Sequence, residues 1–195
     1  MIDLRQVKNR YYIMRHGQSR GNVEKIIVSS PDNGIPGYGL TQKGKVQADQ
    51  SIKTFQGLDS DTIIYASDFL RTKETAEIVD RHLNTKRGIT CSPLLRERFF
   101  GDWELTPDEN YSRIWEEDAQ NIVIPANHVE SVRSVLNRVL TCISALEEQY
   151  RDKNILLVSH GDTLQIFLTH LKGWDPHRHR EIDHLDVAQI RCAIS

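Results

Sequence analysis

The chain has 195 residues, 38% of them hydrophobic and 27% charged, which is the size and composition of one globular domain. Lysine and arginine number 25 against 27 aspartate and glutamate, so the net charge of −2 excludes a global basic field for nucleic acid or an anionic membrane. The N-terminal stretch lacks an apolar core of signal-peptide length and no apolar run is long enough for a membrane span, so we expect one cytoplasmic domain over residues 1–195.

Short apolar runs alternate with helical patterns along the chain, as in a parallel sheet whose strands are buried on both faces. A last segment, 188–194, alternates apolar with polar residues and predicts an antiparallel edge strand. Together these patterns predict an α/β fold, a three-layer α/β/α sandwich with a mostly parallel central sheet. The predicted strands are 11–14, 62–66, 89–91 and 155–158, and the predicted helices are 40–55, 69–83, 127–150 and 163–171.

Three features of the elements and their connections call for specific expectations. Asn127 and Glu130 have the spacing of a capping pair, so we expect them to open the longest helix. The loops 23–39 and 103–127 are long enough to be insertions or lids over a binding site. Aromatic side chains in and beside the second loop either line a substrate pocket or form a satellite core, namely Phe99, Phe100, Trp103, Tyr111 and Trp115.

Polar residues follow each predicted strand, at the sheet edge where ligands bind in doubly wound folds. Arginine forks match phosphate oxygens, and neighbouring guanidinium groups keep an imidazole neutral and nucleophilic. A protonated carboxyl group can supply the proton that a leaving alkoxide needs. The residues are, strand by strand, Arg15 and His16, then Ser67 and Arg71, then Arg96 and Glu97, then His160 and Gly161.

Each of these residues also has a plain structural interpretation. A single histidine or arginine at a strand end is often only a hydrogen-bonded loop residue. Glu97 lies between Arg96 and Arg98 and would fit a surface ion pair. Ser67 and Asp68 would fit the N-terminal cap of the following helix. The coincidence of all the groups at one sheet edge favours a phosphate site.

The cysteines and the C-terminal histidines are expected to have no metal-binding role. Cys91, Cys142 and Cys192 are odd in number and widely spaced, which indicates reduced thiols in the core. No Walker loop, dinucleotide fingerprint or standard metal-ligand spacing is present, so we expect neither a metal nor a cofactor. The same expectation covers the histidine-rich segment 175–184, with Asp175, His177, His179 and His184.

Several motifs, in the same order, resemble those of the histidine phosphatase superfamily, the phosphoglycerate mutase-like proteins. The first has the family signature Arg-His-Gly-[Glu/Gln] with an asparagine a few positions later. The resemblance covers almost the whole chain, and the motifs taken together are highly specific for this family. The segments are RHGQSRGN (15–22), LTQKG (40–44), SDFLRTKETAEIV (67–79), LRERFFGDWE (95–104), ESVRSVLNRV (130–139) and VSHGDTLQ (158–165).

This resemblance implies a phosphohistidine at His16, with Glu97 as the proton donor. It implies a small-molecule phosphate ester as substrate and no metal or organic cofactor for hydrolysis. Gly17 and Gly161 would let backbone approach the phosphoryl group closely. The rest of the implied phosphate pocket consists of Arg15, Arg71 and His160, with Asn22 as an auxiliary polar contact.

Three activities remain open within the resemblance: phosphatase, phosphoglycerate mutase, and binding without catalysis. The segment RERFFGDWEL and the short chain resemble the small phosphatases more than the mutases. The chain departs from the phosphatase pattern at Leu105, where glycine is usual, in NHVES (127–131), which lacks a glycine-rich approach, and in the long loop 23–39. These departures bear on the identity of the substrate and not on the chemistry. The sequence specifies neither the substrate nor the oligomeric state.

Overall fold

The computed structural model describes residues 2–120 and 126–195. In this part of the chain, five strands form one sheet in the order β3-β2-β4-β1-β5. The strands β1 to β4 pair in parallel, whereas β5 runs antiparallel to β1 at the edge, as predicted. Their bounds are β1 (Arg10–Arg15), β2 (Ile63–Ala66), β3 (Ile89–Cys91), β4 (Asn154–Ser159) and β5 (Ile190–Ile194).

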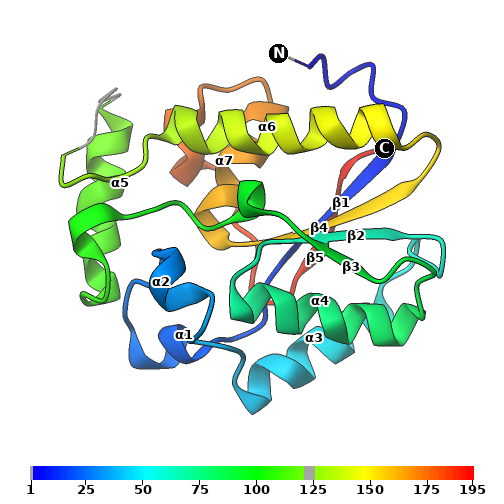
Figure 1. Ribbon diagram of the computed structural model, residues 1–195. Helices are drawn as coiled ribbons and strands as arrows, with labels where there is room; N and C mark the ends of the chain where they lie inside the picture. The colour runs from blue at the N-terminus through cyan, green and yellow to red at the C-terminus, as the bar shows by residue number, and fades with distance from the viewer. Residues whose placement is uncertain (1, 121–125) are drawn as a thin grey trace.

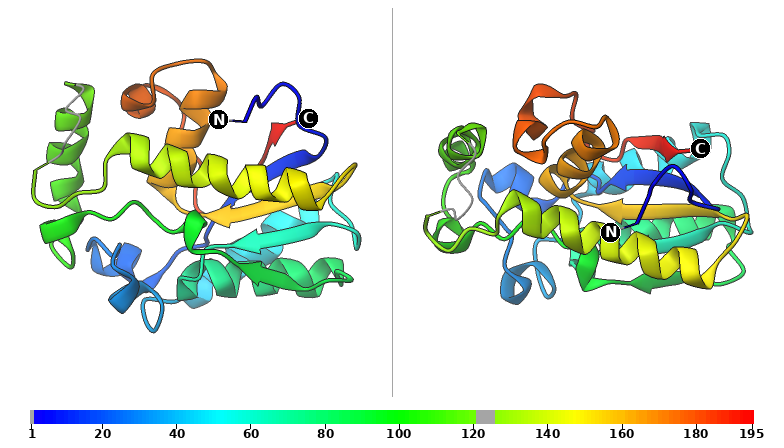
Figure 2. Two further views of the ribbon diagram at one scale, coloured as in Figure 1. Left: turned by 45° about the horizontal axis from the view of Figure 1, so that its top comes forward. Right: turned by 90° about the horizontal axis from the view of Figure 1, so that it is seen from above.

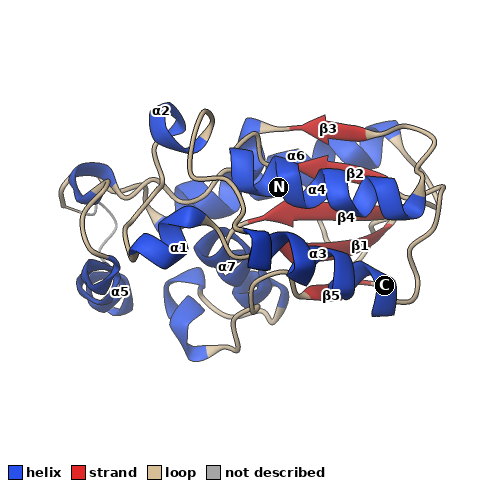
Figure 3. Cartoon of the chain, turned by 90° about the horizontal axis from the view of Figure 1, so that it is seen from below, coloured by secondary structure: helices blue, strands red, loops and turns tan. Residues whose placement is uncertain are grey.

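Helices cover both faces of the sheet, which confirms the predicted sandwich (Figures 1 and 3). Tyr11 and Ile13 point to one face, and Tyr12 and Met14 to the other, so β1 contributes to two cores, as do β2 and β4. This double burial explains why the strands have continuous apolar sequences. No helix of the described ranges combines the length and apolarity needed to cross a bilayer. One face carries α6 (Val132–Gln149) and α7 (Gly161–Leu171), and the other α3 (Gln42–Thr54) and α4 (Leu70–Leu83).

The longest helix begins later than predicted. Asn127 has a φ of 57°, which is incompatible with a helical start, and α6 begins only after Ser131. The Ser131 side chain accepts the hydrogen bond from the backbone N–H of Ser134 and is the actual cap. Glu130 instead forms an ion pair with Arg138 at 2.9 Å. The predicted capping pair is therefore wrong, because the chain turns where Asn127 lies.

The two long loops contain helices of their own and lie together beyond the carboxyl ends of the strands (Figures 2 and 3). The N–H of Ile27 donates to the carbonyl of Thr106 at 2.9 Å, and the N–H of Leu105 donates back to the carbonyl of Ile27 at 2.8 Å. Residues 121–125 of the second loop lie outside the described residues. The helices are α1 (Arg20–Glu24), α2 (Pro31–Gly34) and α5 (Tyr111–Ala119).

Cysteine placement corrects one expectation. Cys142 is buried in the core between α6 and the sheet, as predicted, but Cys91 and Cys192 are exposed. Both exposed cysteines lie in edge strands, β3 and β5, where the sheet is not covered on every side. The apolar neighbours of these two residues in sequence therefore did not indicate burial of the thiol.

Leu105 occupies a backbone conformation that favours glycine. Its φ is 61°, in the left-handed region, and its side chain is 45% exposed, so little packing compensates the strain. We expect Leu105→Gly to raise the free energy of unfolding by about 1 kcal/mol, after the added flexibility of the unfolded chain offsets part of the gain. Urea denaturation measures the change. Leu105→Ala keeps the Cβ atom and serves as the control, and an equal gain in that variant would contradict the backbone explanation.

Candidate active site

The sheet brings the two predicted active-site histidines together. His16 follows β1 and His160 follows β4, and these strands are adjacent, with Arg15 opposite Ser159 in the register. The two imidazole ring centroids lie 5.3 Å apart. The N–H of His16 donates to the carbonyl of Ser159 at 3.1 Å, and its carbonyl accepts from the N–H of Ala188 at 3.1 Å. The position of His16 is therefore set by two neighbouring chain segments.

Arg71, in the first turn of α4, lies between the two histidines. Its Nε atom is 3.1 Å from His16 Nε2 and 3.2 Å from His160 Nδ1, and its Nη2 atom donates to the carbonyl of Val28 at 2.9 Å. Arg71, His16 and His160 are all buried. A guanidinium in this place puts a fixed positive charge within reach of any group bound between the rings.

The hydrogen bonds of His16 define which ring nitrogen carries the lone pair. Its Nδ1 atom lies 2.7 Å from the carbonyl oxygen of Gly17, which only accepts, so Nδ1 carries the proton and Nε2 has the lone pair. Burial lowers the pKa of His16 well below its ordinary value, and the charges of Arg71 and Arg15 lower it further. The imidazole is thus neutral at pH 7 and its Nε2 atom faces the cations.

His160 is also neutral, and a hydrogen bond to Ser67 orients its ring. Burial lowers its pKa well below the ordinary value, and Arg71 and His16 add to the shift. Its Nε2 atom lies 2.9 Å from the hydroxyl of Ser67, which follows β2. Because Arg71 Nε–H donates to His160 Nδ1, the ring proton lies on Nε2 and is donated to the Ser67 hydroxyl.

Arg15 provides a second guanidinium beside His16. Its Nη1 atom donates to the carbonyl of Leu185 at 2.9 Å. In residues 2–120 and 126–195, its Nε atom is buried and has no hydrogen-bond partner. A Cβ atom on Gly161 would lie only 3.4 Å from this guanidinium, so the glycine leaves the approach to Arg15 open. An anion is the partner that a buried, unsatisfied guanidinium N–H favours.

Glu97 completes the group from the loop after β3. Its Oε1 atom accepts from the N–H of Arg98 at 3.0 Å and from the hydroxyl of Thr163 at 3.2 Å. Burial raises the pKa of Glu97, the negative charge of Asp162 raises it further, and Arg71 acts in the opposite direction. A carboxyl group with a raised pKa holds a proton that it can donate.

A pocket of about 290 Å³ contains most of the predicted residues. Arg15, His16, Arg71, Glu97 and Gly161 line it, and so does Asn22, whose side-chain oxygen accepts from the N–H of Ser19 and caps α1. His160 lies behind Arg71 and does not line this pocket. Of the five aromatic residues, Phe100, Tyr111 and Trp115 line it, whereas Phe99 and Trp103 do not.

Two predicted neighbours of the site have other surroundings. Gly17 does not line the pocket; a Cβ atom there would lie 2.4 Å from the carbonyl oxygen of Gly44, so close packing against α3 accounts for this glycine. Arg96, which follows β3, pairs with Asp68 at 2.6 Å and does not line the pocket.

The histidine-rich segment separates into three environments. His177 contacts Asp175 at 2.7 Å, His184 lines the pocket, and His179 is fully buried. Within the described ranges, no group of three or more histidine, cysteine, aspartate or glutamate side chains is arranged to hold a metal ion.

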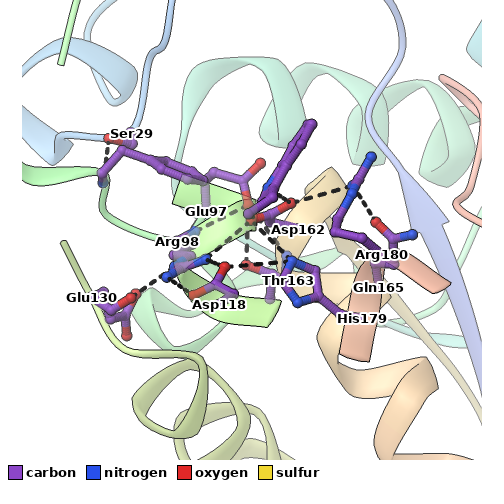
Figure 4. A network of polar contacts seen from close by, with 12 residues as sticks. Ser29, Glu97, Arg98, Asp118, Glu130, Asp162, Thr163, Gln165, His179 and Arg180 are labelled. Carbon is purple, nitrogen blue, oxygen red and sulfur yellow. Dashed lines mark hydrogen bonds and ion pairs between the residues drawn. The ribbon is translucent and has the colours of Figure 1, made fainter. Parts of the chain in front are cut away.

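A buried ionic network behind Glu97 was not predicted. Arg98 forms a bidentate pair with Asp118 of α5, with one contact of 2.8 Å, and its Nε atom donates to the carbonyl of Glu130 at 2.7 Å (Figure 4). Asp162 lies 3.6 Å from Arg98 and accepts from the indole N–H of Trp115 at 3.1 Å. The network fixes α5 against α7. The sequence signal was that Arg98 and Asp162 lie within two of the family-like segments, 95–104 and 158–165.

Removing the cation of this network is expected to be costly. Arg98→Leu leaves two buried carboxylates, Asp118 and Asp162, without their shared partner, so we expect a loss of about 3–5 kcal/mol in the free energy of unfolding. Urea denaturation measures it, and Lys86→Leu, which breaks the exposed pair with Asp61, is the control and should hardly change the midpoint. A small effect of Arg98→Leu would mean that the network does not stabilise the fold.

Comparison with known proteins places this geometry in a family. The family model described as histidine phosphatase superfamily (branch 1) matches residues 11–193. The adenosylcobalamin/alpha-ribazole phosphatase of Escherichia coli is 30% identical over 175 residues, covering 84% of this chain and 79% of that protein. A probable phosphoglycerate mutase of Salmonella paratyphi C is 32% identical, covering 83% of this chain and 74% of that protein.

Solved structures agree with the sequence comparison. The crystal structure of a putative alpha-ribazole-5'-P phosphatase from Escherichia coli superposes with a TM-score of 0.72 at 27% identity, covering 95% of this chain and 96% of that one. Because the family model spans nearly the whole chain and the fold matches over the same range, the chain belongs to the histidine phosphatase superfamily, branch 1, a superfamily of phosphohydrolases.

Proposed function

We propose that this protein hydrolyses phosphate monoesters of small molecules through a covalent phosphohistidine at His16. The observation that carries the proposal is the state of His16: a buried, neutral imidazole whose Nδ1–H is bound to the Gly17 carbonyl and whose Nε2 lone pair faces Arg71. The related phosphatase of Escherichia coli and the family membership support the same reaction.

The proposed reaction has two transfers that use only side chains of the chain. In the first, His16 Nε2 forms a bond to phosphorus while the ester P–O bond breaks, and Glu97 gives its proton to the leaving oxygen. In the second, water attacks phosphorus, its proton passes to the Glu97 carboxylate, and the N–P bond breaks to release phosphate. Arg15 and Arg71, which line the pocket, stabilise the phosphoryl oxygens in both steps.

Phosphate binding has a local consequence in this proposal. Arg71 Nε now lies against the lone pairs of both histidines, at 3.1 and 3.2 Å. A bound phosphoryl group takes these hydrogen bonds over and frees His16 Nε2 for attack. The negative charge of the bound ester therefore releases the His16 Nε2 lone pair, which then attacks the phosphorus of the same ester.

A phosphoglycerate mutase is the second candidate, favoured by the similarity to the Salmonella protein. The test follows phosphate release from p-nitrophenyl phosphate and a panel of sugar phosphates, alongside phosphoglycerate interconversion with and without a bisphosphorylated primer. We expect hydrolysis to dominate. Isomerisation faster than hydrolysis would establish the mutase instead, and no turnover of any ester would leave only a binding role.

A further inference from the structure

The pocket extends beyond the residues that would hold the phosphoryl group. Arg15 and Arg71 supply two positive charges, which match the two negative charges of a phosphate monoester. Besides Arg15, Arg71, His16 and Glu97, the titratable lining residues with a carboxylate, guanidinium or imidazole are Asp108, Asp162, Arg180 and His184, and they form what we call the outer part of the pocket. The balance of charge in this outer part decides which leaving groups the pocket accepts.

Arg180 is part of the pocket wall and has protein partners already (Figure 4). Its guanidinium lies 3.6 Å from the ring centroid of Trp115, and it donates to the side-chain oxygen of Gln165. That oxygen has a fixed direction, because the Gln165 amide nitrogen donates to the carbonyl of Ile182 at 2.8 Å. Asp162 lies 3.7 Å from Arg180 and compensates its charge.

The whole network behind this wall is electrically neutral. Arg98 and Arg180 provide two positive charges, and Asp118 and Asp162 provide two negative ones. Burial lowers the pKa of His179, so this imidazole adds no positive charge at pH 7. The network therefore offers no surplus cation to an anionic substituent of the substrate.

Asp108 lies on the opposite loop and is not compensated in this way. Its backbone N–H donates to the carbonyl of Lys25 at 2.8 Å, which pins it beside the first loop. Among the described residues, no cationic side chain forms an ion pair with its carboxylate. The outer pocket thus has an excess of one negative charge, carried by a good hydroxyl acceptor.

We propose that the leaving group of the substrate is a compact, hydroxylated alcohol without negative charge, and that Asp108 selects it by accepting a hydroxyl and repelling carboxylates and second phosphates. The inference rests on the phosphatase function proposed above. The small volume, about 290 Å³, sets the compact size.

Two esters with the same carbon skeleton test the proposal. Glycerol 3-phosphate ends in a hydroxymethyl group where 3-phosphoglycerate has a carboxylate. The assay is run at pH 8, where imidazoles in water are neutral. We expect kcat/KM for phosphate release to be at least tenfold higher for glycerol 3-phosphate than for 3-phosphoglycerate. The ratio should fall in 0.5 M NaCl, because salt screens the repulsion.

Asp108→Asn removes the negative charge. We expect it to lower the ratio of kcat/KM for glycerol 3-phosphate to kcat/KM for 3-phosphoglycerate at least fivefold, chiefly because kcat/KM for 3-phosphoglycerate rises. Glu109→Gln is the matched control, since it removes the same charge from an exposed neighbour that does not line the pocket, and it should keep the wild-type ratio. Equal use of the two esters by the wild type, or an unchanged ratio in Asp108→Asn, would overturn the inference. Absence of phosphate release from both esters and from p-nitrophenyl phosphate would overturn the phosphatase proposal itself, and the inference with it.

Discussion

A His16→Ala protein is expected to hydrolyse p-nitrophenyl phosphate at least about 10⁴-fold more slowly than the wild type, because the attacking nitrogen is gone. His160 is not placed to replace it, since its Nδ1 atom is occupied by Arg71 Nε at 3.2 Å and the ring does not line the pocket. Initial rates at saturating ester measure the loss.

A covalent label separates loss of the nucleophile from loss of binding. The wild type, quenched in alkali during turnover of a ³²P-labelled ester, should retain a phosphoramidate that acid removes, and His16→Ala should retain none. His82→Ala, on the exposed side of α4, is the control and should behave as the wild type. Label or near-normal turnover in His16→Ala would sink the proposed mechanism.

Glu97→Gln is expected to discriminate between leaving groups. For alkyl esters, whose alkoxide needs a proton, we expect kcat/KM to fall by about 10²–10⁴-fold, whereas p-nitrophenyl phosphate should lose less than about tenfold. The comparison uses kcat/KM because this quantity reports the first transfer alone. A plot of log(kcat/KM) against the pKa of the leaving alcohol measures the difference as a steeper slope.

The pH profile gives an independent test of Glu97. Its pKa is raised by burial and by Asp162, and the protonated form is the active one in the first transfer. The wild-type kcat/KM for alkyl esters should therefore decline as pH rises through that pKa, and the decline should vanish in Glu97→Gln. Glu148→Gln, exposed on α6, keeps the decline as a control. Equal losses on all esters with an unchanged profile would argue against a proton donor at position 97.

The sequence allowed the catalytic group to be predicted because each member follows a strand or opens a helix at one sheet edge. Continuous apolar runs located β1 and β4, and the parallel pairing then brings His16 and His160 together. Their chemical roles stay predictions until the variants are measured. Position after a strand does not by itself place a residue in the site: Arg96 follows β3, but it forms an ion pair with Asp68.

The charged residues of the outer pocket were beyond prediction because they come from segments far apart in the chain: the loop before α5, the first turn of α7 and the segment that follows α7. Asp108, Asp162 and Arg180 are separated by 54 and 18 positions, and no local period links them. The spacing of Asn127 and Glu130 predicted a helix cap, but Asn127 has a positive φ and does not cap α6. Exposed Cys91 and Cys192 show that apolar neighbours in an edge strand do not guarantee burial.

The backbone of His16 is hydrogen-bonded on both sides, to Ser159 after β4 and to Ala188 before β5. Exchange of its amide hydrogen with solvent requires breaking the hydrogen bond to Ser159 between two adjacent strand ends, so we expect this amide to be among the well protected ones. Local fraying is therefore not expected to displace His16, the proposed nucleophile, so activity in rising urea should persist until the cooperative transition and disappear with it. Asp108 of the outer pocket is held by a different contact, from its N–H to the carbonyl of Lys25, so a substitution of its side chain leaves the two hydrogen bonds of His16 intact.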